Sequence, residues 1–145
     1  MNGLLSYMGS ITNKEMSAVQ ARMMHPLTLA YIGDTVYDLF VRTYLIYTND
    51  VPVHQLHKMS VSFVKAQSQS EALHKIEELL TEEEMHIVRR GRNAKSGTIP
   101  KNAAVTEYRW ATGFESLLGY LYLTGQGNRL CEIAGNILLN EAKKE

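Results

Sequence analysis

Apolar residues recur at helical spacing along most of the chain. Between positions 27 and 47, for example, Leu29, Ile32, Val36 and Leu39 return every three or four residues, as one buried face of an α-helix requires. No two alternating segments are joined by an Asn-Gly or Asp-Gly turn, so nothing favours a β-hairpin. We therefore expect an all-α fold. The pattern predicts helices over 27–47, 53–80 with a break near 59–60, 81–90, 105–123 and 129–143.

Polar residues between these segments indicate where helices begin and end. The run from Thr81 to Glu84 is typical of a capping box, in which each of these two side chains accepts a hydrogen bond from the backbone N–H of the other. Glycine, asparagine and proline predict a loop over 91–102. Residues 1–24 are weakly patterned, and we expect an N-terminal extension with room for one short helix.

Length and composition limit the class of protein. The chain has 145 residues, 45% of them hydrophobic, which suits one globular domain. Fifteen Lys and Arg residues balance fifteen Asp and Glu residues, so net charge alone does not indicate a nucleic-acid partner. The single cysteine, Cys131, cannot form an internal disulfide, and we expect a core thiol. No apolar run approaches the ~20 residues that cross a bilayer. We expect a cytoplasmic protein that is not bound to a membrane.

Two carboxylates lack a cation one helical turn away. Asp38 has Arg42 at that distance, whereas no Lys or Arg stands three or four residues from Asp34 or from Glu115. Each of these two acids could form a salt bridge or an N-cap elsewhere in the fold. Alternatively, both could converge on Mg²⁺, which prefers carboxylate oxygens. Glycines beside both acids indicate a close helix crossing or a large ligand: Gly33, Gly113 and Gly119.

The segment from 89 to 101 holds five cations and no acid. Such a composition suits contacts with phosphate groups, which dominate the affinity of proteins for nucleic acids. A solvated loop without a ligand is the alternative. The candidate phosphate-binding residues are Arg89, Arg90, Arg92, Lys95, Ser96 and Lys101.

Three segments of the chain resemble the catalytic domain of ribonuclease III. The segment 29–38 resembles its signature helix, and 112–121 resembles its second metal-binding helix. The segment 90–102 resembles the loop of Mini-III, the short ribonuclease III relatives that lack a double-stranded-RNA-binding domain. The order and spacing of the three segments make the resemblance specific.

The chain departs from the full-length family at two acidic positions. Ala30 stands where that family has a glutamate, and Thr112 where it has an aspartate. Of the acidic cluster, Asp34 and Glu115 remain on matching positions, and the resemblance implies that they are the catalytic and metal-binding residues. Fewer protein ligands imply more water and phosphate around the metal ion.

The resemblance implies a homodimeric endonuclease domain over residues 25–145. It implies an endoribonuclease that depends on Mg²⁺, with Mn²⁺ as a substitute, and that cleaves double-stranded RNA to leave 5′-phosphates. The implied substrate is precursor 23S ribosomal RNA, with RNA-binding residues in the basic segment and a ribosomal protein as helper. The competing hypotheses are a non-catalytic helical RNA-binding or ribosome-assembly factor, and a metal-dependent hydrolase of small nucleotides.

Overall fold

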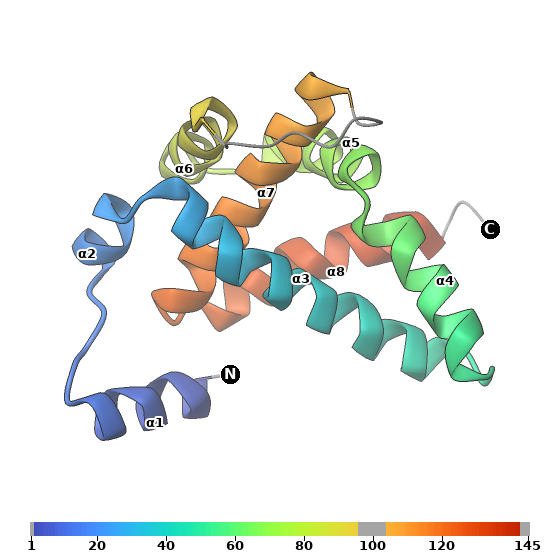
Figure 1. Ribbon diagram of the computed structural model, residues 1–145, viewed down its shortest axis with the longest axis horizontal. Helices are drawn as coiled ribbons and strands as arrows, with labels where there is room; N and C mark the ends of the chain where they lie inside the picture. The colour runs from blue at the N-terminus through green and yellow to red at the C-terminus, as the bar shows by residue number, and fades with distance from the viewer. Residues whose placement is uncertain (1, 96–103, 143–145) are drawn as a thin grey trace.

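The computed structural model describes residues 2–95 and 104–142, and these residues form the expected all-α fold (Figure 1). In chain order the elements are α1 (Asn2–Thr12), α2 (Ala18–Met23), α3 (Pro26–Thr48), α4 (Val53–Val64), α5 (Ala66–Ile76), the short 3₁₀ helix η1 (Glu77–Leu79), α6 (Glu82–Asn93), α7 (Val105–Leu123) and α8 (Gly127–Ala142).

Helix α7 is the centre of the fold. It packs against α3, α5, α6 and α8, and Figure 1 shows it crossing α3 with α5 and α6 on its two sides. Phe114 of α7 is fully buried, and its ring meets the ring of Tyr37 edge-on at a centroid distance of 5.0 Å. Ten of the nineteen residues of α7 are buried. A helix that is covered on most sides explains why its sequence is apolar with little amphipathic pattern.

The capping box at the start of α6 is confirmed. The Thr81 hydroxyl accepts a hydrogen bond from the Glu84 N–H at 3.1 Å, and Glu84 Oε1 accepts one from the Thr81 N–H at 2.9 Å. Arg129 of α8 also donates to both carboxylate oxygens of Glu84, each at 2.8 Å. Burial by itself would raise the pKa of Glu84, but the hydrogen bonds from Arg129 and Thr81 lower it overall. This buried ion pair ties α6 to α8.

Three sequence predictions about local structure are wrong. The helical region after 53 breaks at Lys65, whose backbone is extended, and not near 59–60. Helix α6 continues to Asn93, so Gly91 is helical and does not begin a loop. Cys131 is exposed on α8 and is not a core thiol, because the buried face of α8 consists of Leu130 and the residues three, four, seven and eight positions further on.

The N-terminal extension contains two helices where one short helix was expected. Helix α2 has its own capping box, formed by Ser17 and Gln20. Helix α1 lies apart from the other helices in Figure 1, and four of its large apolar side chains are exposed: Leu4, Tyr7, Met8 and Ile11. No helix in the described part of the chain is long and apolar enough to span a membrane.

Candidate active site

Helices α3 and α7 cross at two glycines. A Cβ on Gly33 would lie 1.7 Å from the backbone oxygen of Glu115, and a Cβ on Gly119 would lie 1.9 Å from the backbone oxygen of Leu29. Real Cβ atoms do not come this close to a backbone oxygen, so only glycine allows the two backbones to touch here. Because Asp34 follows Gly33 directly, the crossing brings Asp34 next to Glu115.

The structure brings the carboxylates of Asp34 and Glu115 within hydrogen-bonding reach of each other. Asp34 is exposed and Glu115 is half-buried. Burial, followed by the hydrogen bond and the charge of Asp34, raises the pKa of Glu115 to about 9. Neither acid forms an ion pair with any Lys, Arg or His in the part of the chain that the structure describes.

This pair of acids fits a divalent cation. Two adjacent carboxylates without a cation can relieve their repulsion by sharing a proton, and a bound metal ion would replace that proton. Among the described residues, no group of three or more His, Cys, Asp or Glu could hold a metal. Ala30 offers no ligand, and the Thr112 hydroxyl donates to the backbone oxygen of Tyr108 at 3.0 Å. A site with two carboxylates suits Mg²⁺, which keeps several of its waters.

Gln69 of α5 completes this site, and the sequence analysis missed it. Its side chain is 2% exposed and hydrogen-bonds the Glu115 carboxylate, which opposes the rise in the pKa of that group. Nothing along the chain links the two positions. A signal was present, because Gln69 precedes Leu73 and Ile76 by four and seven residues and therefore stands on the apolar face of its helix.

Of the candidate phosphate-binding residues that the structure describes, two are exposed and two contact other parts of the fold. Arg89 and Lys95 are exposed. The Arg90 guanidinium instead donates to the backbone oxygens of Arg22 and of Met24, the latter at 3.1 Å, and so fixes the junction of α2 and α3 against α6. The Arg92 guanidinium lies over the ring of Trp110, 4.8 Å from its centroid. Ser96 and Lys101 lie outside the described residues.

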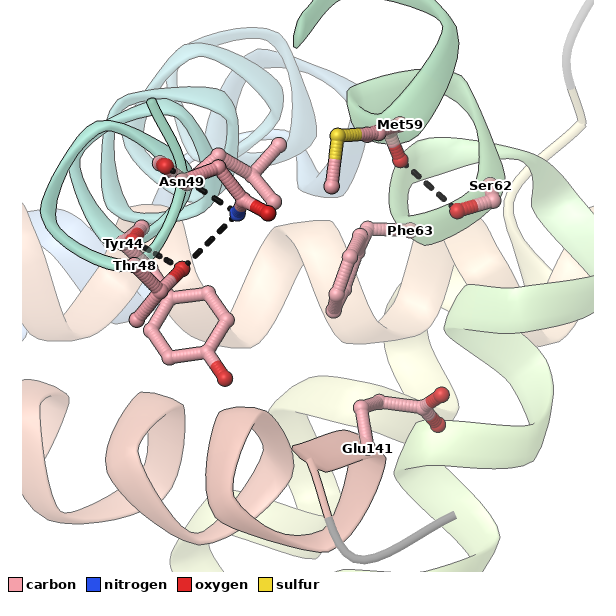
Figure 2. A pocket seen from close by; sticks show the side chains of 8 residues that line it. Tyr44, Thr48, Asn49, Met59, Ser62, Phe63 and Glu141 are labelled. Carbon is pink, nitrogen blue, oxygen red and sulfur yellow. Dashed lines mark hydrogen bonds between the residues drawn. The ribbon is translucent and has the colours of Figure 1, made fainter. Parts of the chain in front are cut away.

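A pocket lies away from the two carboxylates, between the C-terminal end of α3, α4 and α8 (Figure 2). The rings of Tyr44 and Phe63 meet edge-on beside it at 6.3 Å, and the Glu141 carboxylate of α8 lines it from the opposite side. Neither Asp34 nor Glu115 lines this pocket. It therefore does not supply the closed pocket around the two acids that a hydrolase of small nucleotides would need.

Comparison with known proteins identifies the class. Residues 27–126 match the family model described as the ribonuclease III domain. The chain belongs to this family and is an endoribonuclease, which confirms the resemblance recognised in the sequence motifs.

Similar proteins of this family include two that are named Mini-ribonuclease 3. The chain is similar to the Mini-ribonuclease 3 of Thermoanaerobacter sp. (strain X514), with 50% identity over 88% of this chain and 91% of that protein. It is also similar to the Mini-ribonuclease 3 of Staphylococcus aureus, with 42% identity over 81% of this chain and 89% of the relative. A crystal structure of a Fusobacterium nucleatum protein aligns with a TM-score of 0.77 and 29% identity, covering 87% of this chain and 99% of that one.

Proposed function

We propose that the chain is a Mg²⁺-dependent endoribonuclease that cleaves double-stranded RNA as a homodimer, with Asp34 and Glu115 as its catalytic and metal-binding residues. The observation that carries the proposal is the contact between these two carboxylates, which come from different helices and have no cationic partner in the described part of the chain. A non-catalytic RNA-binding factor would instead hold each acid in a salt bridge. The catalytic domain is assigned to residues 25–145.

The two acids have different tasks in this proposal. A Mg²⁺ ion held by the two acids would supply an activated, oriented water and charge stabilisation for the leaving oxygen. The carboxylate of Asp34 is exposed, where a phosphodiester could approach, and the half-buried Glu115 on α7 would hold the ion together with it. Attack of water on phosphorus breaks the bond to the 3′-oxygen and leaves a 5′-phosphate and a 3′-hydroxyl. The close approach of α3 to α7 at Gly33 keeps both acids in place.

Exposed apolar residues on α3 support a homodimer. Tyr31, Leu39 and Ile46 are 80%, 55% and 65% exposed, and their spacing of seven or eight residues places them on one stripe of the helix. Asp34 lies one helical turn from Tyr31, at one end of this stripe. Burying this stripe against its symmetry copy would bring two active sites together. Two sites are required to cut both strands of a duplex, and the described part of each chain holds one such contact between Asp34 and Glu115. Two-fold symmetry is also the commonest arrangement of protein oligomers.

The natural substrate in this proposal is a stem of precursor 23S ribosomal RNA in the cytoplasm. An A-form duplex is recognised through its shape, phosphates and 2′-hydroxyls. The exposed cations Arg89 and Lys95 suit such contacts, together with Lys101 and Ser96 of the same segment. Because the net charge is zero, the attraction to RNA must be local, and a ribosomal protein that binds the same RNA would strengthen it.

The decisive experiment is incubation of the protein with a long RNA duplex, with and without Mg²⁺. We expect cleavage on both strands only with Mg²⁺ or Mn²⁺, and products with 5′-phosphates. Asp34→Asn removes the negative charge with almost no change of shape, so it should abolish cleavage and leave the helical content intact. Asp50→Asn, an exposed acid after the end of α3, is the matched control and should cleave normally. Near-normal activity of Asp34→Asn would contradict the proposed site.

A further inference from the structure

Gln69 is a polar side chain in a buried position of α5. It is 2% exposed, while Leu73 and Ile76 on the same face of the helix are fully buried. Its Nε2 donates to the backbone oxygen of Val64 at 2.8 Å, next to the extended Lys65 that separates α4 from α5. The same side chain reaches the Glu115 carboxylate. Gln69 therefore links the junction of α4 and α5 to the candidate active site.

One hydrogen-bonding atom of the Gln69 carboxamide has no partner among the described residues. A carboxamide offers two N–H donors and one acceptor oxygen. Val64 and Glu115 account for the two donors, but Oε1 is buried without a hydrogen-bond partner among the described residues. Buried acceptors in native proteins nearly always have a donor, and ordered water commonly supplies it. The unsatisfied oxygen lowers stability, so the fold retains Gln69 for the groups that its N–H donors hold.

We propose that Gln69 is a positioning residue of the active site, which fixes the orientation of the Glu115 carboxylate. The inference rests on the proposed function, because it takes Asp34 and Glu115 as the ligands of a divalent cation. Glutamate has three side-chain torsions, and a donor on one of its oxygens leaves the other in a fixed place. Hydrogen bonds of this kind orient metal-binding carboxylates in proteins generally.

The test compares Gln69→Met with Gln67→Met. Methionine keeps an unbranched side chain of similar length but makes none of the hydrogen bonds of Gln69. Gln67 lies two residues earlier on the exposed face of α5, where its amide donates to Glu71 at 3.2 Å. The affinity of the RNA-free protein for Mn²⁺ is measured by electron paramagnetic resonance, and kcat and KM are measured on an RNA duplex with Mg²⁺.

We expect Gln69→Met to lower the affinity for Mn²⁺ about 10-fold, as loss of a hydrogen bond to a metal ligand commonly does. The value of kcat should fall, while KM for the duplex should stay the same, because a side chain that is 2% exposed cannot contact the RNA. Gln67→Met should change none of these quantities. If Gln69→Met melts below the assay temperature, Gln69→Asn replaces it, since it keeps the amide but is too short to reach both partners.

Wild-type Mn²⁺ affinity and kcat in a folded Gln69 variant would overturn the inference. Failure of both variants to fold would also overturn it, because the side chain would then serve the junction of α4 and α5 alone. Glu115→Gln is measured in parallel to separate this outcome from failure of the proposed function. If Glu115→Gln keeps Mn²⁺ binding and cleavage, the metal site itself is wrong. If it loses both while Gln69→Met keeps both, only the role of Gln69 is wrong.

Discussion

Glu115 occupies an unfavourable setting for a charged carboxylate. Burial and the neighbouring Asp34 raise its pKa from the ordinary value of 4.5 to about 9, against the opposing hydrogen bond from Gln69. Between these two pH values the folded, metal-free protein keeps a proton on Glu115 that the unfolded chain releases. The contribution of Glu115 to the free energy of unfolding is therefore largest below about pH 4.5. It decreases as the pH rises towards 9.

Glu115→Gln should remove this pH dependence, because glutamine is neutral throughout. In EDTA at pH 8 we expect the variant to have a higher melting temperature than the wild type. The difference should be roughly 2–4 °C for each kcal/mol by which the substitution lowers the cost of burying a charge. At pH 5 the two melting temperatures should be equal. Added Mg²⁺ should raise the melting temperature of the wild type and leave that of the variant unchanged. Thermal melts followed by circular dichroism across pH 5–9 check this. Equal pH slopes for the two proteins would contradict it.

Two residues of the candidate active site could be predicted from the sequence alone. Asp34 and Glu115 stood out because no cation lies one helical turn away, a property that depends only on local spacing. Gln69 could not be connected to them, since its contact with Glu115 exists only after α5 packs on α7. For the same reason the sequence placed Arg90 among the phosphate-binding candidates, while in the fold its guanidinium holds the backbone of Arg22 and Met24.

At the scale of helices, the closest approach of α3 to α7 is made by backbone atoms at two glycines. Gly33 and Gly119 leave no room for a Cβ, and Gly91 and Gly113 do the same where α6 meets α7. Mid-helix glycine costs about 1 kcal/mol relative to alanine, so these positions trade local helix stability for close packing. The crossing thereby fixes the separation of the two candidate catalytic acids.

Gly119→Ala should force α3 and α7 apart. We expect the free energy of unfolding to fall by about 3 kcal/mol, as for severe overpacking, and cleavage to fall with it because Asp34 and Glu115 separate. Gly135→Ala in α8 is the matched control, since a Cβ there meets nothing within 4 Å. It should raise stability by about 0.5–1 kcal/mol through helix propensity alone. Urea unfolding of the three proteins measures both changes. Equal effects of the two substitutions would refute the proposed crossing.

The bounds of the helices were predictable where pattern and caps agree. The prediction for 105–123 matches α7, and the capping box placed the start of α6 correctly. The predictions failed where a tertiary contact decides the outcome. Gly91 was read as a loop residue, but it stays helical because α7 packs against it so closely that an added Cβ would overlap Ser116. No local signal distinguishes such a glycine from one that ends a helix.

At the scale of the whole molecule, the proposed dimer would supply the two sites that cut the two strands. Leu39→Asp would place a charge in the middle of the exposed apolar stripe of α3, whose ends are Tyr31 and Ile46. We expect this variant to sediment as a monomer at micromolar concentration and to lose coordinated cleavage of both strands. Leu139→Asp on α8 changes a leucine that is 63% exposed, compared with 55% for Leu39, and should remain dimeric. A wild-type monomer that still cuts both strands would contradict the dimer.

A chain with no net charge must hold RNA through locally clustered cations. If Arg89 and Lys95 contact phosphates, replacing both by alanine in an Asp34→Asn background should weaken binding equally for all duplex sequences. It should also reduce the slope of log K against log salt by about two, one for each lost contact. Replacing the exposed Lys14 and Lys58 should leave the slope unchanged. Arg92→Ala should instead lower thermal stability, because its guanidinium packs over Trp110. An unchanged slope for the first pair would show that these cations do not bind RNA.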